Sequence, residues 1–93
     1  MSIGNFILFI VMKKIVITGA NRGIGLGLVN ELIEKGHNLV AGVRNPDTSE
    51  ELIKIKAKRP SNLSILKLDL LDDKSITNFC ESINFPTIDI LIN

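Results

Sequence analysis

The stretch Thr18–Gly25 reads TGANRGIG, and it lies between an apolar run at 15–17 and an amphipathic run that extends through Leu32 and Ile33. This order of a strand, a glycine-rich turn and a helix start predicts a seat for a phosphate group. The first turn of a helix offers unpaired N–H donors and the positive end of the helix dipole. Glycine residues let the chain turn tightly and approach a ligand without an intervening Cβ.

The composition fits one small globular α/β domain. The chain has 93 residues, of which 45% are hydrophobic, and its 11 basic and 10 acidic residues give a net charge of +1. Because charges of both signs are interspersed, we expect no nucleic-acid binding. The single cysteine, Cys80, excludes an internal disulfide and a cysteine-based metal cluster, and it favours a reducing, cytoplasmic location.

Residues 1–12 form an apolar stretch ahead of the predicted domain at 13–93. The run Phe6–Met12 is much shorter than the ~20 residues that span a bilayer. It also lacks the preceding basic residue and the following cleavage site of a signal peptide. We therefore expect an N-terminal extension without a function of its own and no membrane insertion, with a weak membrane anchor as the alternative.

Downstream, apolar strand-like runs alternate with helical patterns. Helices are predicted at 23–35, from Thr48 to about Lys58, and from Asp72 onward. Strands are predicted at 14–18, 38–43, 63–68 and 88–92. Short connections between alternating strands and helices indicate a parallel sheet with right-handed crossovers. The predicted fold class is therefore α/β, part of a Rossmann-type doubly wound sheet with strand order 3-2-1-4.

Local signals mark where these helices begin and end. Gly36 is a suitable residue just past the first helix. Thr48, with Glu51 three residues later, predicts a capping box at the second helix, and Asp72 predicts a cap on the third. Spacings of three, four and seven residues predict a buried face on the third helix, made of Ile76, Phe79, Cys80 and Ile83.

The glycine spacing is Thr-Gly-x-x-x-Gly-x-Gly, not the commoner Gly-x-Gly-x-x-Gly. In its strand–helix context, and with three further matches downstream, residues 13–93 resemble the N-terminal part of the classical short-chain dehydrogenase/reductase family. The stretch Gly19–Gly27 and the later Arg44–Pro46 are similar to carbonyl-reductase-like members. The resemblance implies an oxidoreductase that transfers hydride between a nicotinamide cofactor and a small-molecule carbonyl or alcohol substrate.

Two arginines bear on which nicotinamide cofactor is bound. Arg22 precedes the second glycine of the motif, and Arg44 follows the second strand. NAD-specific folds place an acidic side chain near that strand end, where Gly42 and Val43 stand here. A guanidinium presents a planar fork of donors to phosphate oxygens. The resemblance therefore implies NADP(H), and the alternative is that both arginines are solvated surface residues.

The resemblance implies further cofactor contacts. It places Asp69 against the amino group of adenine, with Leu70 lining the ring, and Asn93 along a ribose of the cofactor. Asp69 could instead cap the following helix, although Asp72 is better placed for that role. Asn21 would reach a ribose or phosphate from the glycine loop, or merely support the turn. The remaining implied contacts come from the turn itself, at Gly19, Gly23, Ile24 and Gly25.

Other polar residues are expected to have structural roles. Thr18 is expected to brace the glycine turn, and His37 to be an exposed turn residue without catalytic partners. Asp89 is interpreted as a surface group at the start of a strand. A set of basic side chains is expected to form the solvated face of a helix: Lys54, Lys56, Lys58 and Arg59.

The resemblance also implies chemistry for which this chain has no residue. In that family a serine and a Tyr-x-x-x-Lys pair assist hydride transfer, and this sequence contains no tyrosine. We therefore expect the NADP(H)-binding portion of a short-chain oxidoreductase, cut off after its fourth strand, inactive by itself and marginal in stability. The alternative is a non-catalytic NADP(H)-binding or regulatory module. An unpaired fourth strand would leave a sheet edge open to self-association.

Overall fold

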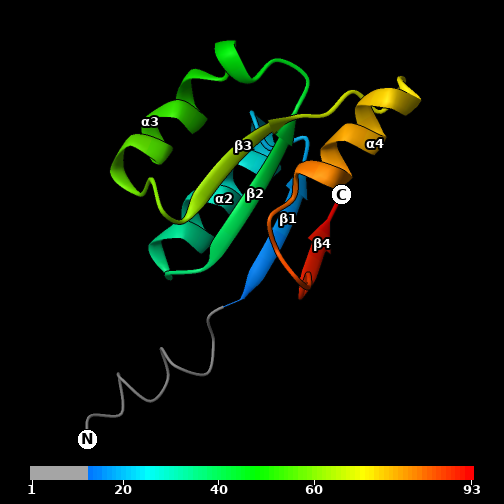
Figure 1. Ribbon diagram of the computed structural model, residues 1–93. Coiled ribbons are helices and arrows are strands. Elements are labelled where there is room, and N and C mark those ends of the chain that lie inside the picture. The colour runs from blue at the N-terminus through cyan, green and yellow to red at the C-terminus, as the bar shows by residue number, and fades with distance from the viewer. Residues whose placement is uncertain (1–12) are drawn as a thin grey trace, which may run out of the picture.

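Apolar runs and helical runs alternate along the chain, and they fold into a sheet with helices packed on it (Figure 1). The computed structural model describes residues 13–93, so the predicted extension at 1–12 lies outside the described residues. The strands are β1 (Lys14–Thr18), β2 (Asn38–Val43), β3 (Leu63–Lys67) and β4 (Ile90–Ile92). The helices are α2 (Gly23–Glu34), the short 3₁₀ turn η1 (Pro46–Thr48), α3 (Glu50–Lys58) and α4 (Asp73–Ser82).

All four strands run parallel, in the order β3-β2-β1-β4. β1 pairs along its whole length with β2, from Lys14 opposite Asn38 to Thr18 opposite Gly42. Its other side pairs with β4. The predicted α/β class and the strand order 3-2-1-4 are therefore confirmed.

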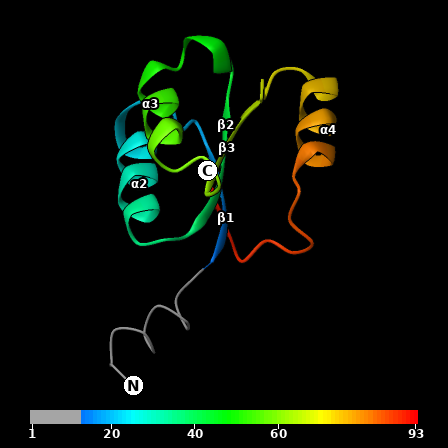
Figure 2. The ribbon, with the colours of Figure 1, turned by 60° about the vertical axis from the view of Figure 1, so that its left-hand side comes forward.

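Helices cover both faces of the sheet, with α2 and α3 on one side and α4 on the other (Figure 2). Alternate residues of a strand point to opposite faces. Ile15 and Ile17 of β1 belong to the core under α2 and α3, whereas Val16 packs with Phe79 of α4 on the other face. Burial on both faces explains why β1 and β2 read as nearly continuous apolar runs.

Several predicted element ends are confirmed. Gly36 has a φ of 86°, the left-handed conformation expected just past α2. Asp72 caps α4, because its Oδ1 accepts from the N–H of Lys74 at 3.0 Å and from the N–H of Ser75 at 3.4 Å. No helix within residues 13–93 is both long enough and apolar enough to cross a bilayer.

The fourth strand is shorter than predicted, because it begins at Ile90 rather than at residue 88. The side chain of Asp89 explains the difference. Its Oδ2 accepts from the N–H of Lys14 at 2.8 Å, while its own N–H donates to the carbonyl of Lys14 at 2.9 Å. A carboxylate thus replaces a backbone acceptor at this end of the β1–β4 ladder.

The predicted capping box at Thr48 is wrong. Thr48 belongs to η1, and the residue that precedes α3 is Ser49, whose side chain makes no capping hydrogen bond to the helix. Both hydroxyls instead donate back to the carbonyl of Asn45. Serine and threonine often form such local bonds to the backbone in competition with helix capping.

Three predicted exposures are also wrong. Cys80 was predicted to be buried, but it is exposed, although Ile76 and Phe79 of α4 and Ile83 just after it do pack together on the sheet. His37 is buried, not exposed, because its Nδ1 accepts from the N–H of Lys13 at 2.9 Å. Lys56 is half-buried, since its Nζ donates to the carbonyl of Leu63 at 2.6 Å and so links α3 to β3.

Candidate functional site

A cleft of about 360 Å³ lies where the carboxyl ends of β1, β2 and β3 meet. It is lined by residues of the turn after β1, by Gly42–Asn45 around the end of β2, and by Leu68–Leu71 after β3. The carboxyl edge of a parallel sheet is where open α/β folds bind their ligands. The fold therefore gathers the predicted site residues of three separate loops in one place.

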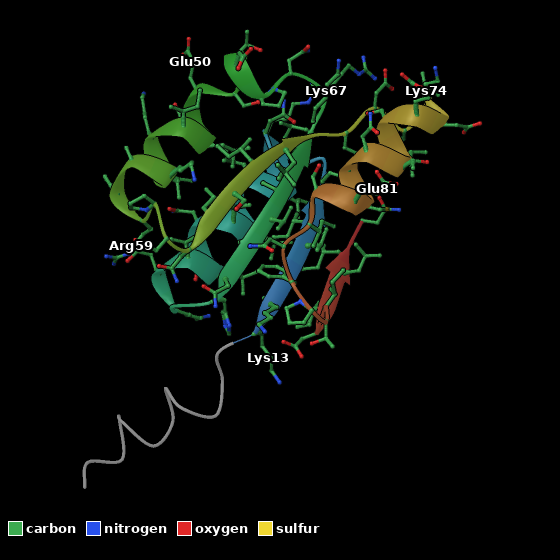
Figure 3. All side chains as sticks on the ribbon, viewed as in Figure 1. Lys13, Glu50, Arg59, Lys67, Lys74 and Glu81 are labelled. Carbon is green, nitrogen blue, oxygen red and sulfur yellow. The ribbon has the colours of Figure 1, made fainter. Side chains whose placement is uncertain are left out.

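A larger hollow, of about 460 Å³, lies between α2 and α3 on one face of the molecule. In Figure 3, Glu50 and Arg59 mark the two ends of α3. Charged side chains on its rim pair with one another, Arg59 with Glu34 at 3.8 Å and Lys54 with Glu51 at 3.5 Å. Its wall is made of helix faces and includes Gly23 as its one residue of the glycine motif, but it lacks the strand ends that line the smaller cleft, so we assign the candidate site to the cleft.

The glycine turn adopts a backbone that residues with side chains rarely adopt. Gly19 has a φ of 62° and Gly23 a φ of 59°. Gly25 is required for a different reason, because a Cβ added there would lie 2.5 Å from the carbonyl oxygen of Gly19. The start of α2 can therefore approach the turn only with glycine at this position.

The first turn of α2 is free of side-chain caps. Arg22 precedes the helix, and its side chain makes no capping hydrogen bond. Helix termini leave N–H groups without intrahelical partners, and here no cap residue covers them. Gly19 is also tied to the neighbouring strand, since its N–H donates to the carbonyl of Gly42 at 3.0 Å. This is the backbone arrangement that binds anions at a helix N-terminus.

Both arginines predicted to bind a phosphate line the cleft. Arg22 and Arg44 are exposed. The three ion pairs found within residues 13–93 use other cations, namely Lys35, Lys54 and Arg59. At the end of β2, a side chain on Gly42 would come within about 3 Å of Phe79 and Leu68, so this position cannot hold a carboxylate without rearrangement. The cleft thus presents two guanidinium groups and no acidic group at that strand end.

Asp69 follows β3 and is half-buried at the cleft. Its Oδ1 accepts from the N–H of Leu71 at 3.0 Å, and its own N–H donates to Ser75 Oγ at 2.8 Å. Asp72 caps α4, so the alternative capping role of Asp69 is not observed. Leu70 and Leu71 are both largely exposed and line the same cleft.

Comparison with known proteins decides the family. A model of the family described as short chain dehydrogenase matches residues 13–93. The chain belongs to the short-chain dehydrogenase family. It is 42% identical over 85 residues to a 3-oxoacyl-[acyl-carrier-protein] reductase of Buchnera aphidicola, and 34% identical over 83 residues to a short-chain dehydrogenase of Penicillium roqueforti. These alignments cover 87% and 85% of this chain but only 34% and 33% of the two relatives.

Solved structures agree with this assignment. The structure of L-sorbose reductase from Gluconobacter frateurii, complexed with NADPH and L-sorbose, matches with a TM-score of 0.75 and 28% identity, over 88% of this chain and 32% of the reductase. A short-chain dehydrogenase from Streptomyces avermitilis matches with a TM-score of 0.79 at 23% identity, over 88% and 30% of the two chains, which shows the shared fold. The chain thus spans about a third of the length of these family members.

Other predicted contacts of this short-chain dehydrogenase chain lie around the cleft. Asn21 is exposed and lines it, whereas Ile24, which is 84% exposed, stands at the start of α2 outside the lining. Asn93 follows β4, and its Oδ1 accepts from the hydroxyl of Thr18 at 2.6 Å. Thr18 therefore links the ends of β1 and β4, in place of the brace within the turn that was predicted.

Six lining residues of the cleft were not predicted as cofactor contacts, and two of them, Asn45 and Leu71, are exposed. Each directly follows a segment that was identified, Arg44 in one case and Asp69–Leu70 in the other. Their positions in the sequence were a usable signal. Their solvent exposure could not be predicted, because it depends on the direction in which the two loops continue from the ends of β2 and β3.

We predict that Gly25→Ala lowers both the stability of the chain and its affinity for a dinucleotide. The added methyl group would overlap the carbonyl of Gly19, which forces α2 away from the turn. Overpacking of this kind costs about 1–3 kcal/mol. Thermal unfolding and cofactor fluorescence titration measure the two effects. Gly27→Ala is the matched control, since a Cβ at Gly27 meets nothing within 4 Å, and equal behaviour of the two variants would refute the prediction.

Proposed function

We propose that residues 13–93 form the NADP(H)-binding portion of a short-chain oxidoreductase that transfers hydride between NADPH and a carbonyl or alcohol substrate, similar to carbonyl reductases. The observation that carries this proposal is the pair formed by Arg22 and Arg44. Both line one cleft at the sheet edge, and neither takes part in an ion pair within the part of the chain that the structure describes. Two uncommitted guanidinium groups suit the 2′-phosphate that distinguishes NADP(H) from NAD(H).

In this proposal the cofactor lies across the carboxyl ends of the strands. The first turn of α2 holds its pyrophosphate, with Asn21 on a ribose or phosphate. Asp69 accepts from the amino group of adenine through Oδ2, because its Oδ1 is already bonded to Leu71. Leu70 lines the ring and Asn93 faces a ribose. The turn contributes its backbone at Gly19, Gly23, Ile24 and Gly25.

The relatives support this proposal without extending it to a substrate. The Buchnera relative is a reductase of a 3-oxoacyl group, and the Gluconobacter structure contains NADPH together with a sugar substrate. When bound, NADPH supplies the hydride. The residues of this chain bind and orient the cofactor, and among its 93 residues no tyrosine is available as a proton donor.

Two further assignments belong to the same proposal. The family match begins at residue 13, which supports a division into an apolar stretch at 1–12 and a cofactor-binding domain at 13–93. A small-molecule carbonyl compound is the proposed substrate of the oxidoreductase, and the cytoplasm is its proposed location. The alternative is a non-catalytic NADP(H)-binding or regulatory module.

We predict that the chain binds NADPH more than about tenfold tighter than NADH, and that Arg44→Asp lowers this ratio. The substitution replaces a phosphate-binding cation with a carboxylate that repels the 2′-phosphate. Dissociation constants from fluorescence titration give the ratio. Lys58→Asp makes the same change of charge on an exposed residue of α3 and serves as the control. Equal affinity of the unmodified chain for both cofactors would remove the proposed preference.

We also predict that the purified chain does not oxidise NADPH in the presence of carbonyl compounds. No tyrosine is present to protonate the nascent alkoxide. Absorbance of NADPH at increasing protein concentration measures the rate. Measurable turnover would overturn this assignment. Both assignments require NADPH binding without turnover, so folding separates them. A non-catalytic module should be soluble and unfold cooperatively, whereas the cofactor-binding portion of an enzyme is expected to be marginal in stability.

The edge strand β4 leads to a third prediction, self-association through the open sheet edge. Within residues 13–93, β4 pairs with β1 alone, and Leu91 is 65% exposed. Exposed apolar edge strands promote strand pairing between molecules, and charged residues block it. We expect sedimentation to show association that Leu91→Lys reduces and that Ile53→Lys, on exposed α3, does not. Association unchanged by Leu91→Lys would locate the contact elsewhere.

A further inference from the structure

Arg44 stands between two backbone carbonyls that the fold holds in place. On its N-terminal side, the carbonyl of Val43 accepts from the N–H of Leu68 at 2.8 Å, which continues the contact between β2 and the segment after β3. On its C-terminal side, the carbonyl of Asn45 accepts hydrogen bonds from η1 and from the residue after it. The backbone that carries Arg44 is therefore fixed at both ends, although its side chain is exposed at the cleft.

Three donors converge on the carbonyl of Asn45. The N–H and the Oγ1 of Thr48 lie at 3.2 and 3.3 Å, and the Oγ of Ser49 lies at 2.9 Å. The bond from Ser49 is the shorter of the two hydroxyl bonds. Ser49 is also buried, with 7% of its surface exposed, whereas Thr48 is exposed. Water therefore competes less for the bond from Ser49 than for the bond from Thr48, so the Ser49 bond is the stronger of the two side-chain hydrogen bonds.

Ser49 occupies a position from which serine usually caps a helix. It directly precedes α3, where a serine oxygen ordinarily accepts from an N–H of the first turn. Here the side chain makes no capping bond, and its hydroxyl points back to Asn45. The buried hydroxyl therefore stabilises the loop that carries Arg44, while the helix it precedes lacks a side-chain cap.

We propose that Ser49 is a positioning residue that sets the preference for NADP(H), because it holds the backbone from which Arg44 reaches the 2′-phosphate. This inference rests on the proposed function, since it requires a phosphate at Arg44. A guanidinium binds phosphate oxygens well only in a narrow range of orientations. NADH has no phosphate at this position and makes no use of Arg44. Loss of the Ser49 hydroxyl therefore weakens NADPH binding selectively.

The experiment compares the dissociation constants of NADPH and NADH for variants of the full 93-residue chain. If the chain associates, all variants are made in the Leu91→Lys background. Removal of one hydrogen bond changes an equilibrium by about three- to tenfold. We expect Ser49→Ala to weaken NADPH binding by about this factor and to change NADH binding by less than about twofold. Ser49→Thr keeps the hydroxyl and should retain the ratio of the unmodified chain.

A matched control removes the same type of bond elsewhere. The hydroxyl of Thr77 donates to the carbonyl four residues earlier, that of Asp73, at 3.1 Å in α4. Thr77→Ala should leave the NADPH-to-NADH ratio unchanged. Ser49→Cys keeps nearly the volume of serine and weakens the donor. An intermediate loss of selectivity in this variant tests the inference even if Ser49→Ala does not fold.

The outcomes separate this inference from the proposed function. Equal weakening of both cofactors by Ser49→Ala would show a purely structural role and overturn the inference. An unchanged ratio in Ser49→Ala, together with a reduced ratio in Arg44→Ala, would overturn it while leaving the proposed function intact. An unchanged ratio in Arg44→Ala would refute the role of Arg44 and this inference with it, whereas equal affinity of the unmodified chain for both cofactors would refute the proposed preference for NADP(H).

Discussion

The close approach of α2 to the turn after β1 is the constraint on which the rest of the site depends. Gly25 permits it, because any side chain there would meet the carbonyl of Gly19. The same turn is fastened to β2 through the bond from Gly19 N–H to the carbonyl of Gly42. The uncapped first turn of α2 therefore lies beside the end of β2, where Arg44 begins its loop. Backbone contacts thus bring the uncapped start of α2 and the loop that carries Arg44 to the same edge of the sheet.

Much of the fold could be predicted because its signals are local. β1 and β2 are buried on both faces and read as continuous apolar runs. Gly36 and Asp72 act within a few residues of their own position, as helix-terminal residues do. The roles of these two residues were predicted correctly because their partners lie close in the sequence.

Two of the errors share a physical cause, which is a hydrogen-bond partner far away in the sequence. His37 is buried because its acceptor nitrogen meets Lys13, 24 residues earlier in the chain. β4 begins late because the carboxylate of Asp89 takes the place of a backbone acceptor opposite Lys14. Cys80 has helical spacing with the apolar face of α4 but lies just beyond its buried stripe. Amphipathic patterns define the centre of such a stripe better than its border.

In the candidate site, too, the sequence shows the type of each residue but not its surroundings. The sequence identifies Arg22 and Arg44 as cations near a phosphate seat, but only the structure shows that neither is engaged in an ion pair within residues 13–93. The charge of an arginine is available to a ligand when no carboxylate already neutralises it and when its backbone is held in one place. The first condition is the absence of a carboxylate partner. The second depends here on hydrogen bonds to the carbonyl of Asn45, the residue after Arg44. A motif specifies neither condition. Under our proposal the preference for one cofactor therefore also depends on the hydrogen bond from Ser49, which does not line the cleft, to the carbonyl of Asn45, which does.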